Sequence, residues 1–231
     1  ATAYEEVNKT TVADAAMAVG DTVVTVTSAA GITAGDIVNF GDEYEYRVVS
    51  VATNDLNIVR KDEPAYFGTS ESSGLHQAPT NGAQVRRRWK YYDLFDKAPG
   101  TSPYAQAKSG VNDELHIVVI DEDGDITGTK GDVLEKFEAV SKASDAKTAQ
   151  GSVNYYPDVI YKASNYIYWM DHNAGGSNWG SAANGTTFTD VTSVSNVSLQ
   201  AGSDGTAATI GQRKTAYEKF QDGETVDVGL I

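Results

Sequence analysis

Short runs of alternating hydrophobic and polar residues fill residues 17–92, and glycines or turn dipeptides separate the runs. In "DTVVTVTSA", Val23, Val24 and Val26 are interspersed with threonine, and "GITAGDIVNFGDEYEYRVVSVATNDLNIVR" continues with runs broken at turn-like spacing. "AQVRRRWKYY" closes the set as a further strand. Strands of about four to seven residues joined by tight turns predict a small all-β barrel or sandwich.

After residue 93 the pattern becomes a mixture of strand and helix signals. The apolar run Leu115–Ile120 is nearly continuous, which predicts a strand buried on both faces. Asp123 and Gly124 tolerate the backbone conformations of a tight turn, and "DITGT" then predicts a short returning strand.

The next two segments carry opposite signals. Val133, Phe137 and Val140 recur at i, i+4 and i+7, so "DVLEKFEAVSK" predicts an amphipathic helix. "YYPDVIYKASNYIYWM" is dense in tyrosine and predicts one or two strands, with Pro157 at a strand start or on an edge. We expect its aromatic side chains to lie mainly in a core, although exposed aromatic faces could instead stack on sugars. These side chains are Tyr155, Tyr156, Tyr161, Tyr166, Tyr168 and Trp169.

Small and polar residues dominate residues 171–212, where few side chains could build a core. That segment predicts long surface loops around short strands such as "TSVSNVSLQ". A last helix in "GQRKTAYEKFQD" and an apolar strand in "ETVDVGLI" follow it.

These patterns predict a mixed α+β chain, in which a small all-β barrel domain is inserted in, or precedes, an α/β-type domain with a mixed sheet. We place the barrel at residues 17–92 and the second domain at residues 93–231. The N-terminal segment, residues 1–16, leads into the barrel and could belong to the second domain. Because the chain ends on a predicted strand, which needs a neighbour, we expect it to be a piece of a longer polypeptide.

The composition restricts the functions that the chain can have. Cysteine is absent, which excludes disulfides, thiolate nucleophiles and cysteine-based metal sites. The net charge of -14 argues against nucleic acid as a partner, because phosphate repels such a surface. His76, His116 and His172 lie far apart in the sequence, which argues against a histidine-rich zinc site. No apolar run approaches the roughly 18 to 20 residues that span a bilayer, and we see no signal-peptide pattern.

The carboxylates around Asp121 are the first candidate for a metal site. Asp121, Asp123 and Asp125 match three acidic positions of an EF-hand loop, but Gly124 falls two positions early and Asp132 replaces the final glutamate. We therefore interpret them as an acidic hairpin turn and leave weak cation binding open. No nucleophile elbow, P-loop or dinucleotide fingerprint occurs, so we expect no catalytic, cofactor-binding or metal-binding residues. We accordingly expect no enzyme.

One basic cluster stands out in this acidic chain. On a strand, alternate members of the cluster would face opposite sides of the sheet. One interpretation is a charged edge strand that resists aggregation, and the other is a contact with an acidic neighbour such as another copy of the chain. The cluster consists of Arg86, Arg87, Arg88, Trp89 and Lys90.

Two stretches resemble the middle region of contractile tail sheath proteins from myovirus-type bacteriophages. The first is "DELHIVVIDEDGDITGTKGDVLEKFEAVSKASDAK", in which a strand, an acidic Asp-Gly turn, a G-T-x-G-x-V-L-E helix start and the "VSKASDAK" tail follow in that family's order; "NYYPDVIYKASNYIYW" comes next. The second is "SLQAGSDGTAATIGQRKTAYEKFQDGETVDVGLI", although Gln200 to Gly205 departs from the family's Gly-Gly form. Residues 19–92 resemble, more loosely, the small β-barrel that some sheath proteins carry as an insertion.

The resemblance implies a fragment from the outer, protruding part of a sheath subunit. Such subunits polymerise around the tail tube and contract after a baseplate signal, which drives genome delivery. The implied partners are other copies of the sheath protein, the tail tube and the baseplate, with no nucleic acid and no membrane insertion. The implied location is the virion tail sheath, made in the host cytoplasm. We expect the isolated chain to be a monomer, because the arms that link neighbouring sheath subunits are not recognisable in it.

Two other classes of function remain open from the sequence. A secreted carbohydrate-binding or adhesin module would account for the β-rich, aromatic and loop-heavy composition. A small α/β hydrolase or transferase would require a concave pocket with converging polar groups.

Overall fold

The structure is a computed structural model that describes residues 3–61, 74–173, 175–192, 194, 197–199 and 207–219. Over these residues the chain is a mixed, sheet-rich protein with eight strands and three α-helices, which confirms the predicted α+β class. The chain divides into two units, Ala1–Ser195 and Asn196–Ile231. The strands are β1 (Glu5–Thr11), β2 (Val23–Thr25), β3 (Ile37–Asn39), β4 (Tyr46–Ala52), β5 (Asp55–Arg60), β6 (Gln84–Arg88), β7 (Glu114–Asp121) and β8 (Asp132–Ser141), and the helices are α1 (Pro103–Ala107), α2 (Tyr156–Ala163) and α3 (Ile210–Glu218).

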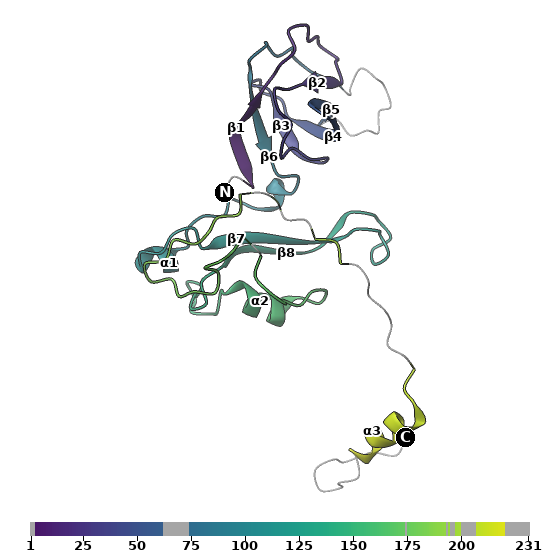
Figure 1. The fold of residues 1–231 in the computed structure, drawn as a ribbon, viewed down its shortest axis with the longest axis vertical. Helices are drawn as coiled ribbons and strands as arrows, with labels where there is room; N and C mark the ends of the chain where they lie inside the picture. Colours follow the sequence, from purple (N-terminus) through teal and green to yellow (C-terminus); the bar gives the residue numbers. More distant parts are fainter. Residues whose placement is uncertain are drawn as a thin grey trace. The chain divides into compact units, whose positions relative to one another are not determined.

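The first six strands form one antiparallel sheet in the order β1-β6-β3-β4-β5-β2 (Figure 1). Alternate residues of these strands turn to one core, as in β4, where Tyr46 and Val48 are buried and Arg47 is exposed. The strand in segment 1–16, β1, pairs with β6, so this sheet draws on both predicted N-terminal segments. The buried members of the core are Val12, Val24, Val26, Ala29, Ile32, Val38, Phe40, Tyr46, Val48, Leu56, Ile58, Leu75 and Val85.

The two edges of this sheet meet at one point beyond the ends of β1 and β2. Val12 and Val26 form a single antiparallel bridge there. Two backbone hydrogen bonds flank it, from the Ala13 N–H to the Thr25 carbonyl at 2.9 Å and from the Thr27 N–H to the Thr11 carbonyl at 2.8 Å. The named strands themselves do not pair all the way round, so the predicted closed barrel is not confirmed.

The second sheet is a hairpin of two antiparallel strands, β7 and β8. The mixed sheet predicted for residues 93–231 is therefore not seen among the described residues. The predicted turn does join two strands, but "DITGT" lies in a loop, and the returning strand begins only at Asp132. Because two strands cover so little area, Ile117 and Val119 in the middle of β7 are only half-buried, and the expectation of burial on both faces was wrong.

The predicted helix over Val133–Val140 was also wrong, because these residues form β8. Irregular register interrupts the pairing of β7 with β8, and Ala139 has a left-handed backbone with φ of +49°. An irregularity of this kind adds a residue to the strand, so Phe137 and Val140, three residues apart, both face the core. A strand with an added residue can therefore show the spacing of three residues that is typical of one face of a helix.

The tyrosine-rich segment contains helix α2, where the sequence predicted strands. Pro157 stands in its first turn, where the missing N–H has no cost and the fixed φ suits a helix. Asp158 in the first turn and Lys162 in the last turn both match the helix dipole. Figure 1 shows α2 beside the hairpin, and its Tyr156 and Ile160 pack with Leu115, Phe137 and Val140 in one cluster.

A small cluster of short side chains organises the loop-rich segment 171–192. Phe188 and Trp179 pack there with four alanines, two of which follow β8. The described residues of "TSVSNVSLQ" form no strand, and "ETVDVGLI" lies outside the described residues. The last predicted helix is confirmed as α3 in the unit Asn196–Ile231.

Candidate functional site

The basic cluster begins on β6 and continues into the segment that follows it. The alternation predicted for a strand holds, because Arg87 is buried while Arg86 and Arg88 are partly exposed. The edge-strand interpretation was wrong, because β6 lies between β1 and β3.

Arg87 is occupied by a buried ion pair. Its side chain is 4% exposed, and its Nε and Nη2 atoms donate to the two carboxylate oxygens of Asp36 at 3.0 and 3.1 Å. The Nη1 atom donates to the Ala3 carbonyl at 2.8 Å. Asp36 also accepts from the backbone N–H and the hydroxyl of Thr33. Arg87 is therefore not available for contact with another molecule.

Arg88 belongs to a network of half-buried charges around Tyr92. It pairs with Glu5 at 2.9 Å and with Glu45, and its guanidinium lies 4.9 Å from the centre of the Tyr92 ring. Lys61 pairs with Glu45 at 2.8 Å, and the Tyr92 hydroxyl donates to the same carboxylate at 2.8 Å. Burial alone would raise the pKa of Glu45, but the hydrogen bonds from Lys61 and Tyr92 and the two nearby cations lower it. This network ties β4, β5 and β6 to the segment after them.

Trp89 and Lys90 lie beyond the end of β6. The Trp89 ring stacks at 6.1 Å on Phe95, which stacks at 4.1 Å on His116 of β7. The buried indole N–H of Trp89 has no hydrogen-bond partner within the described part of the chain. Lys90 lies over the Tyr91 ring at 4.9 Å. Arg86 pairs with Glu5 at 3.6 Å, but its side chain is 41% exposed. Of the five cluster residues, Arg86 and Lys90 are therefore the most accessible to another molecule.

His116 connects the segment after β6 to the hairpin. Its Nδ1 accepts from the Ala139 N–H at 3.0 Å, so the proton must be on Nε2, which donates to the Lys97 carbonyl at 2.8 Å. Lys136 of β8 donates to the Leu94 carbonyl at 2.6 Å from the same side. This histidine therefore has a structural role.

The three histidines occupy three different environments. His76 stacks on Tyr44 at 4.1 Å, His116 stacks on Phe95, and His172 lies 2.7 Å from the Tyr156 hydroxyl. No three histidine, aspartate or glutamate side chains within the described ranges come together in a way that could hold a metal ion.

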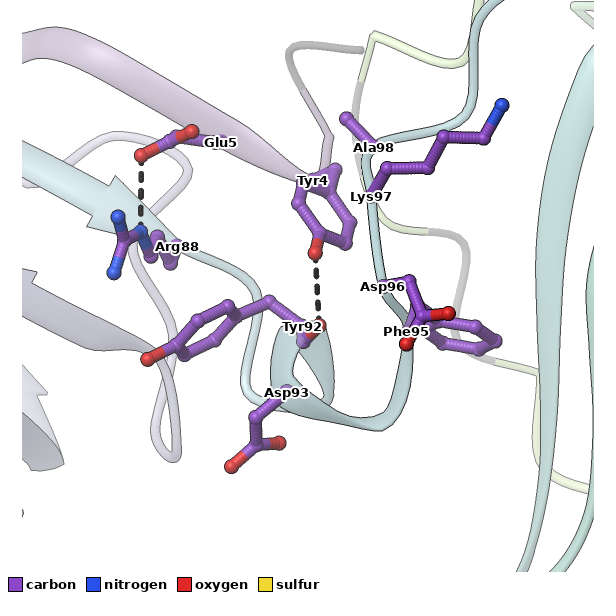
Figure 2. Close-up of a pocket in the computed structure, with 9 residues that line it drawn as sticks. All are labelled: Tyr4, Glu5, Arg88, Tyr92, Asp93, Phe95, Asp96, Lys97 and Ala98. Atoms are coloured by element: carbon purple, nitrogen blue, oxygen red, sulfur yellow. Dashed lines mark hydrogen bonds and ion pairs between the residues drawn. The ribbon is translucent and has the colours of Figure 1, made fainter.

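A hollow of about 330 Å³ opens where the first sheet meets the segment after β6 (Figure 2). The Tyr4 hydroxyl donates to the Tyr92 carbonyl at 2.8 Å, and Glu5 bonds Arg88. Burial, assisted by the charge of Glu5, raises the pKa of Tyr4. Tyr4 with Tyr92 and Glu5 with Arg88 are therefore bonded to one another within this wall. The lining residues are Tyr4, Glu5, Arg88, Tyr92, Asp93, Phe95, Asp96, Lys97 and Ala98.

Asp121 organises the acidic loop of the hairpin. Its Oδ1 accepts from the Gly124 N–H at 3.0 Å, and its Oδ2 accepts from the Ile126 N–H, the Thr127 N–H and the Thr127 hydroxyl at 3.0, 2.7 and 3.0 Å. These donors, with the Thr127 N–H the strongest, lower the pKa of Asp121. Its oxygens therefore serve the loop itself, while Asp123 and Asp125 are exposed. The interpretation as a hairpin turn fits this geometry.

The sequence analysis missed a buried polar network beside the hairpin. Asp113 is fully buried and accepts from the Ser102 N–H at 2.7 Å, the Ser102 hydroxyl at 2.8 Å and the Ser141 hydroxyl at 2.5 Å. The Lys142 ammonium is buried next to it and donates to the carbonyls of Asn112 at 2.8 Å and Thr189 at 3.2 Å. Burial lowers the pKa of Lys142.

The network of Asp113 and Lys142 joins segments that contain little helix or strand. Lys142 also lies 5.3 Å from the centre of the Trp179 ring, so it fixes the loop segment 171–192 against the end of β8. The available signal in the sequence was a lysine at the end of a predicted helix and before small residues, which is too common to identify such a role.

The exposed aromatic residues around α2 form the strongest candidate for a contact site. Core packing was expected for them, and Tyr156 is indeed buried, but Tyr161 and Tyr168 are 73% and 75% exposed. Met170 is 87% exposed. We call this set the aromatic surface, and it consists of Tyr161, Tyr166, Tyr168, Trp169 and Met170.

The segment after α2 returns to the start of the helix. It starts at the C-cap Ser164, whose hydroxyl accepts from the Ile167 N–H at 2.9 Å. Five residues later, the Trp169 indole donates to the hydroxyl of Tyr156, at the start of α2, at 3.1 Å. Tyrosine, tryptophan and methionine are enriched in protein–protein interfaces, so the aromatic surface can support docking.

None of the described helices is long and apolar enough to cross a membrane. Comparisons of the chain with protein-family models, with curated proteins and with solved structures found no match.

Proposed function

We propose that this chain is a structural part of a phage contractile tail sheath subunit, in which it contributes to subunit contacts and has no catalytic role. The observation that carries the proposal is the resemblance over Asp113–Lys147 and Asn154–Trp169. Those two stretches contain β7, β8 and α2, which share one packed cluster. The resemblance therefore follows a unit that folds together.

One part of the resemblance needs a different structural interpretation. The "GTKGDVLE" segment, expected as a helix start, is a loop followed by β8. The order of the elements is then strand, acidic loop, strand and helix. The "AGSDG" loop at residues 201–205 lies outside the described residues.

The first sheet would serve as the protruding domain of the subunit. We infer that it closes into a small barrel through the bridge between Val12 and Val26, because backbone hydrogen bonds join the two edges there. The partners would be other copies of the sheath protein, the tail tube and the baseplate, and the location would be the virion. The net charge of -14 would keep unassembled subunits soluble.

A second candidate function is a carbohydrate-binding or adhesin module. The observation in its favour is the exposure of Tyr161, Tyr168 and Trp169, because exposed aromatic faces can stack on sugar rings. A binding module would act as a separate monomer, whereas a sheath subunit acts in a lattice.

The two candidates are distinguished by expressing the complete polypeptide that contains this chain and imaging it by electron microscopy. We expect tubes of regular diameter. A monodisperse protein that forms no tubes over a range of concentration and salt, and that binds defined sugars on a glycan array, would refute the sheath proposal in favour of the second candidate.

The accessible part of the basic cluster gives a residue-level test. We expect the double variant Arg86→Glu with Lys90→Glu to reduce tube formation, because these are the cluster cations most accessible to an acidic neighbour. Arg86 is 41% exposed although it pairs with Glu5 at 3.6 Å, and Lys90 lies over the Tyr91 ring. A matched variant is Lys97→Glu with Lys130→Glu, which makes the same charge change at two other exposed lysines. Equal tube yields from the two double variants would remove the cluster from the subunit interface.

A further inference from the structure

Strand β8 carries one residue more than β7 at the position opposite His116. On one side of this position, Leu115 pairs with Val140. On the other side, Ile117 pairs with Phe137. Two residues of β8 therefore stand opposite the single residue His116, which is the arrangement of a β-bulge.

The two residues are Glu138 and Ala139, which we call the bulge. Ala139 has a φ of +49°, a left-handed backbone that residues other than glycine rarely adopt. Its N–H donates to the Nδ1 atom of His116 at 3.0 Å, and its carbonyl accepts from the Asn154 amide at 3.0 Å. Side chains thus bond both polar groups of this backbone unit. A strained backbone of this kind persists only where its surroundings hold it, so the two hydrogen bonds maintain the bulge.

The ring of His116 can accept the Ala139 N–H only in its neutral form. A protonated imidazole carries an N–H on both nitrogens and has no acceptor left. The Nε2 atom already donates to the Lys97 carbonyl at 2.8 Å, and the ring stacks on Phe95 at 4.1 Å. The Tyr4 ring meets it edge-on at 6.0 Å. These contacts fix the ring with Nδ1 directed at the bulge.

The charged side chains on the elements around the ring have other partners. Glu114 of β7 pairs with Lys97 at 3.6 Å. From β8, Lys136 donates to a backbone carbonyl of the segment after β6, and Glu138 accepts from a backbone N–H of that segment. No ion pair among the described residues includes His116, so nothing in this arrangement compensates a charge on the ring. The titratable and charged side chains on these elements are Tyr4, Asp96, Lys97, Glu114, Lys136 and Glu138.

We propose that His116 is a pH-sensitive switch that holds the bulge of β8 when it is neutral and releases it when it is protonated. Histidine is the side chain that ordinarily changes its charge between pH 8 and 5. A proton on Nδ1 places an N–H against the N–H of Ala139, whereas Nε2 keeps its hydrogen bond to the Lys97 carbonyl. The ring therefore stays on the segment after β6 while the strained backbone loses one of its two supports. This switch goes beyond the proposed function and does not depend on it.

The bulge determines which side chains of β8 reach the core. Phe137 and Val140 are three residues apart, yet both are buried and pack with Tyr156 and Ile160 of α2. In a strand without an added residue, side chains three positions apart face opposite sides. Release of the bulge therefore lets one of the two leave the core, and acid loosens the packing of α2 on the hairpin.

Amide hydrogen exchange of the natural chain tests the switch, with rates at pH 7.5 and pH 5 corrected for the intrinsic exchange rate. We expect the protection of the Ala139 amide to fall about tenfold at pH 5, because it loses its acceptor. The amides of Ala13 and Thr27 bond backbone carbonyls in the first sheet and should stay within about twofold. Unchanged protection of Ala139, or an equal loss at all three amides, would overturn the proposal.

Two matched variants assign the effect to one ring. His116→Asn offers an acceptor oxygen near the position of Nδ1 and gains no proton in this range, so the Ala139 amide should be equally protected at both pH values. His76→Asn makes the same change in the first sheet and should keep the response of the natural chain. A fall in Ala139 protection that persists in His116→Asn, or that disappears in His76→Asn, would refute the switch.

A measurement on the natural chain applies even if His116→Asn does not fold. The ring ¹⁵N signals of His116 are followed by NMR through the same pH range. We expect them to change at the pH at which the Ala139 amide loses protection. Two separate midpoints would show that another group controls the bulge.

Discussion

The buried pair of Arg87 and Asp36 provides the most direct test of the structure. We consider Asp36→Ala, which removes a carboxylate that is fully buried and accepts four hydrogen bonds. The guanidinium of Arg87 then stays buried with the Ala3 carbonyl as its remaining partner. Breaking a buried pair from one side costs about 3 to 5 kcal/mol, because an uncompensated charge is left inside the protein.

That loss is a large part of the about 5 to 15 kcal/mol by which a typical domain is stable. With a urea dependence of about 2 kcal/mol per molar, the unfolding midpoint should fall by about 2 M. The assay is urea unfolding at pH 7 followed by far-UV circular dichroism, with amide hydrogen exchange in β3 and β6 to localise the effect.

Two further variants make the result interpretable. Glu5→Ala removes the partly exposed partner of Arg88 and should cost less than about 1 kcal/mol. The double variant Asp36→Leu with Arg87→Met replaces the pair by apolar side chains and should recover most of the stability that Asp36→Ala loses. If Asp36→Ala cost no more than Glu5→Ala, Arg87 would not be buried and paired as described.

Four other predictions concern the acidic loop, the paired carboxylates, the buried lysine and the aromatic surface. Asp121→Asn should speed hydrogen exchange of the Ile126 and Thr127 amides about tenfold, because it weakens the acceptor that both amides share. Unchanged protection of these amides would show that hydrogen bonds to Asp121 do not stabilise the loop. The pKa values of Asp121 and Glu45 are both lowered in the folded chain, so the stability that these carboxylates contribute is complete above their unfolded pKa values of 3.8 and 4.5. That stability is lost as the pH falls through the folded pKa values. Unfolding measured between pH 6 and 2 tests this, and a flat profile contradicts it. Burial lowers the pKa of Lys142 in the folded chain, so the unfolded chain binds this proton more tightly. The free energy of unfolding should therefore rise with pH towards 10.5 in the natural chain but not in Lys142→Met. Parallel pH profiles for the two proteins would place the ammonium in water. The double variant Tyr161→Ser with Tyr168→Ser should change the free energy of unfolding by less than about 0.5 kcal/mol, because both rings are exposed. The same variant should reduce tube formation by the complete polypeptide. A large loss of stability would instead place these rings in a core.

The sequence predicted the first sheet more reliably than the hairpin. Period-two patterns correctly predicted strands at β4 and β6, and burial alternates from Tyr46 to Val48 and along β6, although the register of β4 shifts after Val48. β8 was missed because its irregular register, with Ala139 left-handed, gives Phe137 and Val140 a spacing of three. α2 was missed because tyrosine content outweighed Pro157, although a proline followed by an acid is also a helix start.

The candidate site depended on burial, which spacing alone does not determine. Arg87 is the member of the basic cluster whose side chain is paired inside the sheet, because Asp36, 51 positions away in the sequence, lies opposite it. Tyr161 is exposed because the narrow hairpin covers only the side of α2 that carries Tyr156 and Ile160. Such long-range relations are set by the tertiary fold.

The first and last strand residues of the first sheet are neighbours in space. Glu5, at the start of β1, is the register partner of Arg88, at the finish of β6, and the Trp89 N–H donates to the Tyr4 carbonyl at 2.8 Å. Everything between these residues could thus be cut out and the gap rejoined by a very short linker. The same junction would accept a foreign domain whose own termini are adjacent, which makes it a natural grafting position for a reporter or an antigen.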